Sequence, residues 1–468
     1  MAVAIDILTD DALIEIFDFY SDDDFDAWHT LVHVCQRWRN VVFGSSRYLD
    51  LVLLCEPTTP VRESLHIWPP LPIVIFGDMG YPTSGLDNVI AALEHNDRIS
   101  EVTLNDLSFW QLKEVAAAMN RPFPELTYLE LHTDSILVPP LPNSFLGGSA
   151  PCLETLKLSC IQCPTLPNLH SSTPYLQSLH LFNVPYISPN KMLNCLSAST
   201  NLEDLSIEFY PFQPCPGGDW TTRQLRRRIR TFLPVLRRFS FVAIAGFSNY
   251  VEDLVAWIDA PLLESLIVNL FEEPESDTPQ LVRLISRTPM FEAPIEVRVF
   301  FGDGVGGVVL PSSKRATGTE AVTFNITCRD LDRQLSWLAQ ICTSSLPPLL
   351  TVEHLYISDD GKPLLHSQDN IESAQWWDLL RPFTAVKKLY LSKLLAPRIA
   401  PALQELFRES ATGVLPELQN IFSEDFQPSD PAETASWQFV SAKHINRHPI
   451  AVAHWDKELE KWGEDDRW

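Results

Sequence analysis

Basic residues, glycine and long apolar runs are all scarce in this 468-residue chain, which has 17 glycines and 37 prolines. Lysine and arginine number 35 against 60 aspartates and glutamates, so the formal charge is −25. Because phosphate backbones and anionic lipid surfaces are bound by clustered Lys and Arg, we expect neither nucleic acid nor membrane as partner. The longest apolar run, Phe239 to Phe247, is less than half of a bilayer span. Asp6, Asp10 and Asp11 interrupt any apolar leader, so we expect an intracellular protein.

Chemical signatures are equally sparse. Nine cysteines, an odd number scattered along a long chain, predict reduced thiols and no disulfide framework. Cys160-x-x-Cys163, with His170 and His180 nearby, lacks the second short-spaced pair of ligands that a structural zinc site needs. The common nucleophile, phosphate-loop and zinc-protease motifs do not occur, so we predict no metal, no cofactor and no enzyme activity. An active site made of dispersed residues stays open as an alternative.

Two local patterns have ordinary explanations. Gly302-x-Gly304-x-x-Gly307 follows a strand-like segment, but residues 308–311 do not begin a helix that could hold a pyrophosphate, so a hairpin turn is predicted. The only basic cluster, residues 223–230, contains five arginines. It could bind an acidic peptide or phosphate, but a solvated outer helix face is the favoured interpretation.

The first fifty residues form a separate helical unit. Apolar residues at spacings of three and four predict a helix over about 10–20, with Thr9 as its N-cap, followed by an acidic loop. A second periodic stretch runs from Trp28 to Phe43. Two or three such short helices make only a marginal core, which favours stabilisation by a partner or an attached domain.

This unit resembles the F-box family over about residues 6–50. The resemblance lies in Leu8, in Leu13-Ile14-Glu15-Ile16-Phe17 and in Leu31-x-x-Val34-Cys35-Gln36-Arg37-Trp38. The family has proline where this chain has Thr9. The resemblance implies binding to a SKP-family adaptor through Leu8, Ile14, Ile16, Val34, Cys35 and Trp38.

A repeat dominates the remaining sequence. Leu-x-x-Leu-x-Leu begins at Leu126, Leu153 and Leu176, and looser copies begin at 202, 236, 263, 352, 386 and 418. Proline stands two positions before six of these copies and is expected to separate a helix from the next strand. Helical periodicity between copies predicts helices over 191–196, 224–232, 250–258, 280–286, 331–342, 371–380 and 401–407.

The predicted fold class is therefore α/β. A short all-α module, 1–50, precedes a connector and first cap, 51–98, with one strand at 73–76. Residues 99–430 resemble a degenerate leucine-rich-repeat solenoid with parallel strands on its concave face and helices outside. Residues 431–468 are expected to contain a capping helix over about 449–462 and a tail.

The combination is similar to F-box proteins with leucine-rich repeats, particularly those of mushroom-forming fungi. It implies a substrate receptor of an SCF-type cullin-RING ubiquitin ligase, itself without catalytic residues. A repeat scaffold that recruits no ligase is the alternative. Strand phase suggests target contacts at Glu130, His132, Lys157, His180, Glu203, Glu208 and Asn269.

Overall fold

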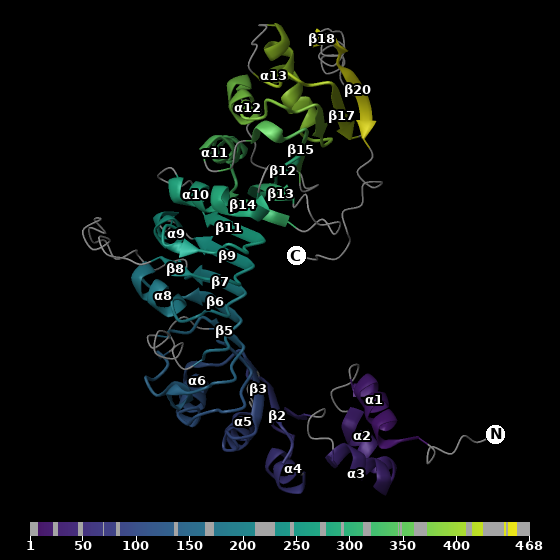
Figure 1. Ribbon diagram of the computed structural model, residues 1–468, viewed down its shortest axis with the longest axis vertical. Coiled ribbons are helices and arrows are strands. Elements are labelled where there is room, and N and C mark those ends of the chain that lie inside the picture. Colours follow the sequence, from purple (N-terminus) through teal and green to yellow (C-terminus); the bar gives the residue numbers. More distant parts are fainter. Residues whose placement is uncertain are drawn as a thin grey trace, which may run out of the picture. The chain divides into compact units, whose positions relative to one another are not determined.

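The computed structural model describes most of the chain and divides it into two compact units, residues 1–204 (unit 1) and 205–468 (unit 2) (Figure 1). The described residues are 8–21, 27–44, 50–68, 70–80, 85–134, 139–163, 173–210, 230–243, 248–271, 278–291, 294–311, 320–344, 346, 349–359, 372–408, 414–424, 444–445 and 448–455.

Unit 1 begins with three helices and continues as alternating strands and helices, which confirms the predicted α/β class. Its elements are α1 (Asp10–Ser21), α2 (Ala27–Val34), α3 (Gln36–Gly44), β1 (Leu51–Leu54), α4 (Val61–Ile67), β2 (Ile73–Asp78), α5 (Leu86–Leu93), β3 (Ile99–Asn105), α6 (Phe109–Ala118), β4 (Tyr128–His132), η2 (Phe145–Gly148), β5 (Thr155–Ser159), β6 (Ser178–Val184) and α8 (Pro189–Leu196).

Unit 2 continues the alternation. It contains β7 (Asp204–Phe209), β8 (Thr231–Phe232), β9 (Arg238–Ala243), α9 (Ser248–Val255), β10 (Ile258–Asp259), β11 (Ser265–Phe271), α10 (Pro279–Arg287), η4 (Pro289–Phe291), β12 (Glu296–Phe301), β13 (Gly304–Pro311), β14 (Glu320–Cys328), α11 (Leu331–Ser344), η5 (Leu349–Thr351), β15 (His354–Asp359), α12 (Ser373–Leu380), β16 (Lys388–Leu391), α13 (Ala396–Arg408), β17 (Asn420–Glu424), β18 (His444–Ile445), β19 (His448–Pro449) and β20 (Ala451–Trp455).

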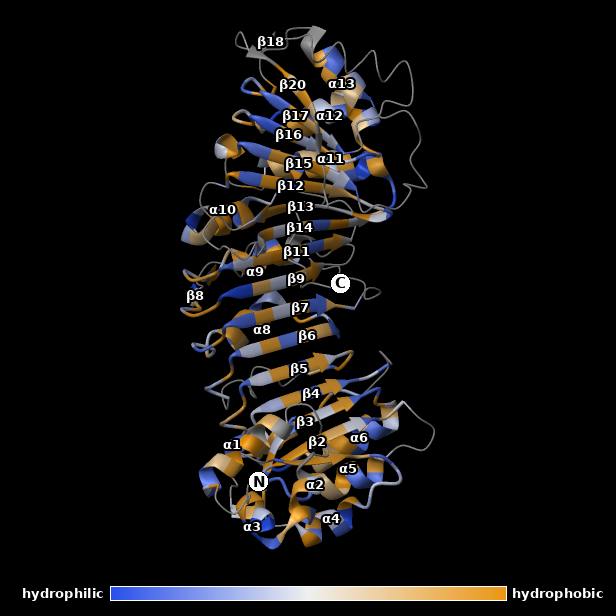
Figure 2. Ribbon diagram, turned by 90° about the vertical axis from the view of Figure 1, so that its right-hand side faces the viewer, coloured by the Kyte–Doolittle hydropathy of each residue, from blue (hydrophilic) through white to orange (hydrophobic). Residues whose placement is uncertain are grey.

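In unit 1, strands β1 to β6 pair in chain order, and each ladder is parallel. Helices α5, α6 and α8 of unit 1 lie along one side of its strands, and helices α9 to α13 of unit 2 lie along one side of theirs (Figure 1). Figure 2 shows hydrophobic and hydrophilic residues alternating along the strands. Each sheet therefore has a covered face and a face turned away from the helices, which we call its open face.

The repeat leucines and their apolar equivalents form the core of both units. Every first, fourth and sixth position of the strict copies is buried, as are the corresponding apolar residues of the looser copies. The preceding prolines occupy the second position of a β-turn: Leu153 N–H donates to the Ala150 carbonyl across Pro151 at 3.2 Å, and the same bond spans Pro261. Proline suits this position because its φ is already near the required value.

Unit 2 departs from chain order at one place. Its sheet runs β7-β9-β11-β14-β13-β12-β15-β16-β17-β20, and β13 is antiparallel to both β12 and β14. The chain thus passes over two strand positions after β11, returns towards β11 through β13 and β14, and reaches β15 through α11. Buried Gln334 of α11 secures this insert by donating to the carbonyls of Gly302 (3.0 Å) and Cys328 (2.5 Å).

Three expectations need correction. Residues 51–98, expected to form a connector and first cap with one strand at 73–76, do contain that strand within β2, but β1, α4 and α5 also belong to the strand-and-helix series there. The expected helix from about 449 is wrong over 451–455, which form β20 beside β17. Residues 231–232, expected to end a helix, form β8 beside β10.

Candidate binding surfaces

The N-terminal helices are held together by a capped start and a cross-helix ion pair. The Thr9 hydroxyl accepts from the Ala12 backbone N–H at 3.3 Å, which confirms Thr9 as the N-cap of α1. From α3, the Arg37 guanidinium donates to the Leu8 carbonyl and pairs with Asp10 at 2.8 Å. The residue in the family's proline position therefore has its own structural role here.

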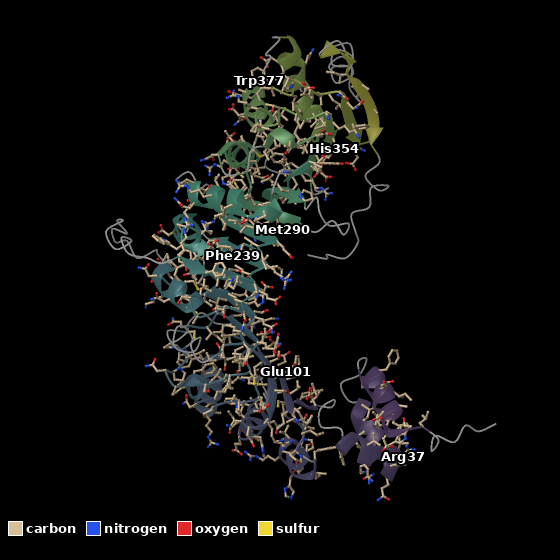
Figure 3. The ribbon with its side chains drawn as sticks, viewed as in Figure 1. Arg37, Glu101, Phe239, Met290, His354 and Trp377 are labelled. Carbon is tan, nitrogen blue, oxygen red and sulfur yellow. The ribbon has the colours of Figure 1, made fainter. Side chains whose placement is uncertain are left out.

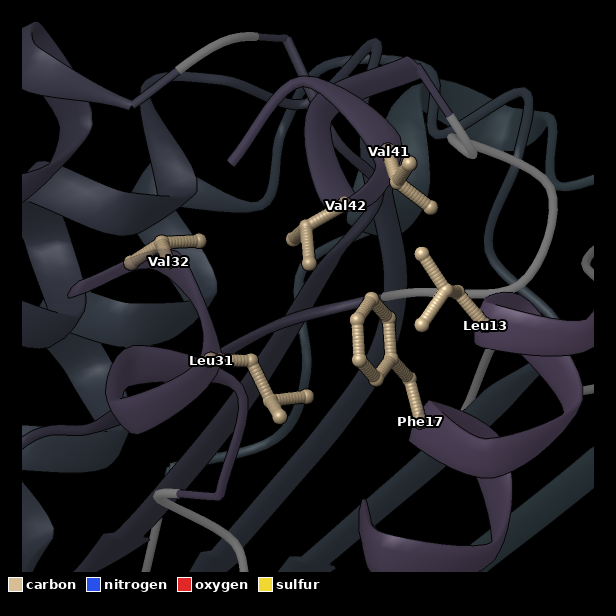
Figure 4. Close-up of a cluster of buried hydrophobic side chains, with 6 residues drawn as sticks. All are labelled: Leu13, Phe17, Leu31, Val32, Val41 and Val42. Carbon is tan, nitrogen blue, oxygen red and sulfur yellow. The ribbon is translucent and has the colours of Figure 1, made fainter. Parts of the chain in front are cut away.

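The three helices of this module share one apolar core. Six buried side chains from all three helices point toward one another: Leu13, Phe17, Leu31, Val32, Val41 and Val42 (Figure 4). The Trp38 ring packs on Phe17, with ring centroids 4.9 Å apart. Phe43 and Trp68, the residue after α4, also pack against this core, and their rings meet edge to face at 5.3 Å.

The six residues expected to bind an adaptor separate into two groups. Leu8, Ile14 and Trp38 are partly buried and pack against the core of the module, and their contact with an adaptor stays a prediction. The other three, Ile16, Val34 and Cys35, are exposed, with Ile16 47% and Val34 52% accessible.

Phe19 is a further surface residue that sequence reasoning missed. Its side chain is 80% exposed. Phe19 follows Ile16 by three positions on α1, so the two residues share one helix face. This spacing was the available signal. Leu13 and Phe17 lie on the buried side of the same helix.

The open face of unit 1 brings four of the predicted target-binding residues together. Glu130, Lys157 and His180 are aligned on neighbouring strands β4, β5 and β6. Lys157 pairs with Glu130 at 3.4 Å and lies 5.2 Å from the Tyr128 ring centre, and the Tyr128 hydroxyl donates to Glu130. His132, two residues along β4 from Glu130, lies on the same face.

Burial of acids adds to the polarity of this face. Glu101, on β3 and labelled in Figure 3, has a raised pKa because burial disfavours its charged form and because Asp50 repels it. The pKa of Asp50 is also raised by burial. Burial thus disfavours the charged form of both carboxyl groups.

A cluster of ligand-type side chains lies where β3 and β4 end. The Nδ1 atom of His132 is 3.0 Å from Asp106 Oδ1. Ligand atoms of His132, Asp106 and Asp134 all lie within 4.8 Å of one another. The pKa of Asp134 is raised, chiefly because its side chain shares a hydrogen bond with Asp106.

The open face of unit 2 carries an aromatic row beside the ion pair that Arg298 forms with Glu296 on β12. Tyr356 and Tyr390 stack with ring centroids 4.1 Å apart, and Tyr390 and Phe422 stack at 4.7 Å. The Arg298 guanidinium lies 5.8 Å from the Tyr356 ring centre. His354, labelled in Figure 3, begins the same strand as Tyr356 and stands on the same face.

The other predicted target contacts have different positions. Glu208 alternates with the buried residues of β7, as expected, and burial raises its pKa. Asn269 of β11 accepts a hydrogen bond from the Asn325 side-chain amide at 2.8 Å. Glu203 needs correction: it is exposed and precedes β7, where its backbone N–H donates to Gln177.

The structure also bears on the remaining motifs. The glycine run forms a hairpin, as predicted: β12 and β13 pair antiparallel, and Gly304 N–H donates to the Gly302 carbonyl at 2.9 Å. Gly307 faces Phe300, and a β-carbon there would come within 2.5 Å of that ring. Cys160 and Cys163 are both partly exposed. His170 and residues 223–229 of the arginine cluster lie outside the described residues.

Among the described helices, none is long and apolar enough to cross a membrane. No family model matches the chain, and no curated protein sequence matches it. Among solved structures, it is similar to the leucine-rich repeat-containing protein LegL7 from Legionella pneumophila, at 13% identity and a TM-score of 0.29. That match covers 85% of this chain and 98% of LegL7. The described part of the chain is mixed α/β, with long, mostly parallel strand pairing in each unit.

Proposed function

We propose that this chain is the substrate-recognition subunit of an SCF-type cullin-RING ubiquitin ligase. Helices α1 to α3 bind a SKP-family adaptor, and the open faces of the leucine-rich repeats bind the target protein. The chain then acts by proximity, because it holds the target near the ubiquitin-loaded enzyme and makes or breaks no bond itself.

Exposed apolar side chains on the helical module carry this proposal. Ile16, Phe19 and Val34 remain accessible although the module already has a filled core. Apolar groups left outside a complete core are typical of a surface that a partner covers. Ile16 and Val34 belong to the F-box-like pattern, which supports a SKP-family adaptor as that partner.

The open faces support the second half of the proposal. Parallel strands place rows of side chains at regular spacing, and these rows differ in chemistry between the units. Such rows can select one protein surface over another through charge and shape. Neither face needs a catalytic group for this role.

A scaffold that recruits no ligase is the second candidate, and Thr9 favours it. The family's proline position is occupied by a residue whose hydroxyl caps α1. If adaptor binding depends on that proline, the module is only a cover for the first repeat. Binding of the adaptor to the intact chain distinguishes the two functions.

The test is co-purification of a SKP-family adaptor with the full chain and its variants. Val34→Asp and Ile16→Asp place a charge in the proposed interface and should each weaken binding by about 100-fold or more. Leu262→Asp is the matched control, because Leu262 is 48% exposed in unit 2. Trp38→Ala is unsuitable, because Trp38 packs on Phe17.

The outcomes separate the candidates. Loss of adaptor in both module variants, with retention in Leu262→Asp, supports the ligase function. Retention in all three overturns the assigned interface. A wild-type chain that captures no adaptor while remaining folded supports the scaffold.

A further inference from the structure

We infer that Trp68 fixes the helical module, α1 to α3, to the start of the repeats and so sets the direction of the adaptor-binding side chains relative to the strands of unit 1. Trp68 is thus a positioning residue. Its role towards the adaptor rests on the proposed function, whereas its packing between two parts of unit 1 is independent of that function.

Trp68 reaches the core of the module from outside the three helices. Among the described apolar residues that pack against this core, Trp68 is the only one that lies outside residues 8–43. Its ring meets that of Phe43 on α3 with centroids 5.3 Å apart and an angle of 84° between the ring planes. Edge-to-face packing is a favoured arrangement of aromatic rings, so this contact defines a relative direction as well as a distance.

The backbone at Trp68 is held by the repeats. Its N–H donates to the Ser64 carbonyl at 2.9 Å where α4 ends, and Leu65 of α4 is buried. Three residues after Trp68, the Leu71 carbonyl accepts from two nitrogens of the Arg98 guanidinium, at 2.9 and 2.7 Å, just before β3. The chain is therefore fixed to the repeats on both sides of the ring that enters the module.

The size of the module explains what this contact contributes. Helices α1, α2 and α3 have 12, 8 and 9 residues. Helices this short are marginal alone and depend on packing for their stability. The Trp68 ring adds apolar area to that packing from an element that the repeats hold. Because an edge-to-face ring pair is lost when one partner rotates, the same contact restricts the direction of the module.

This direction matters for a protein that acts by proximity. Ile16 and Val34, the exposed residues assigned to the adaptor, lie on α1 and α2. An adaptor bound to them is held in a set direction from the open face of unit 1 as long as Trp68 stays packed. Orientation of this kind contributes to rate, since even small misplacements of reacting groups slow a reaction.

The experiment measures the distance between two nitroxide labels on the full chain by double electron–electron resonance. Unnatural amino acids carry the labels at exposed Asp11 on α1 and exposed Asp87 on α5, so that native cysteines stay unlabelled. Wild type should give one narrow distance distribution, and Trp68→Ala should broaden it. Trp68→Phe keeps a ring and should preserve the narrow distribution. Trp110→Ala is the matched control, because it removes a 67% exposed indole from α6.

A second variant and a second measurement separate this inference from the proposed function. Phe43→Leu removes the other ring of the pair and should broaden the distribution as Trp68→Ala does; circular dichroism and thermal melting check that each variant is folded. The affinity of both variants for a SKP-family adaptor should stay within about twofold of wild type, because distant sites act independently. A wild-type chain that binds no adaptor would overturn the proposed function and leave the distance result standing.

Two results would overturn the inference. One is a wild-type distribution as broad as that of Trp68→Ala, which would mean that the module is not held in one direction. The other is a narrow distribution that folded Trp68→Ala and Phe43→Leu both retain, which would mean that other contacts set the direction of the module.

Discussion

The two open faces differ although the strands beneath them share one construction. On unit 1, Lys157 and Glu130 pair across β5 and β4, and their side chains remain about a third exposed. On unit 2, Tyr356 and Tyr390 stack across β15 and β16 and are less than a tenth exposed. In both units the residues between these positions are buried apolar groups.

This difference shows that the strand residues on the covered face are more constrained than those on the open face. Alternate residues of a strand point to opposite faces, so the covered residues fix the packing and the open residues are free to diverge. The polar face of unit 1 suits recognition by charge, which is sensitive to salt and pH. The aromatic face of unit 2 suits recognition by shape and apolar contact.

Truncation of one core leucine in each unit tests the shared construction and should have the largest effect. Leu156→Ala in β5 and Leu389→Ala in β16 each leave a cavity under a fully covered position. We expect each to lower the free energy of unfolding by about 3 kcal/mol, within the usual range for buried leucines. Urea denaturation with hydrogen exchange of the affected strand measures the loss.

The control is Thr155→Ala on the open side of β5, which should change the unfolding free energy by about 0.5 kcal/mol or less. If Leu389→Ala lowers the free energy of unfolding by no more than this control does, the two units do not share one kind of core.

Helix starts offer a second comparison, because the two units cap them differently. In unit 1, Ser108 and Gln111 form a local capping box at the start of α6. In unit 2, the start of α10 is capped by Glu252 of α9, whose carboxylate accepts from the N–H groups of Gln280 and Leu281 at 2.8 and 2.9 Å. Only the second cap can titrate.

Glu252→Ala and Ser108→Ala should therefore respond differently to pH. Burial raises the pKa of Glu252, and Asp253 adds to the shift, while the two backbone hydrogen bonds and Arg283 oppose it. A raised folded-state pKa means that the contribution of Glu252 is complete below its unfolded value of about 4.3 and declines as pH rises through the folded value.

The free-energy difference between wild type and Glu252→Ala should thus decrease from acid to neutral pH. The difference for Ser108→Ala, about 1 kcal/mol for loss of a cap, should stay constant. Denaturation of both variants at several pH values measures this. An increase with pH for Glu252→Ala would contradict the raised pKa.

Much of this architecture could be predicted because it depends on local alternation. The strict repeat that begins at Leu126 placed Leu129 and Leu131 in the core, and the residues between them, including Glu130, then had to face away. Neighbouring parallel strands kept this register, so Lys157 came to lie beside Glu130. Thr9 was likewise identified as a cap from its position before an apolar helix.

What could not be predicted depends on contacts between distant residues. Strands β12 and β14 alternate in the same way, so their sequences do not say which one lies beside β11. Trp38 fits either a surface or a core position on α3, and its packing on Phe17 decides between them. The apolar spacing around Val452 suits a helix as well as a strand, and pairing with β17 selects the strand.

Two double-mutant cycles, one on each open face, are the finest test of the comparison. The Glu130 and Lys157 pair should couple by about 0.2 to 1 kcal/mol, since both side chains are partly exposed, and this energy should fall as salt is added. The Tyr356 and Tyr390 pair should couple by about 0.5 to 1.5 kcal/mol, because offset rings attract through their quadrupoles and exclude water. Salt should leave this second coupling energy unchanged.

The measurement is denaturation of each single and double variant. Leucine replaces each tyrosine, glutamine replaces Glu130 and methionine replaces Lys157. Equal salt dependence in the two cycles would mean that the faces do not differ in the physical basis of recognition, whatever their residues suggest.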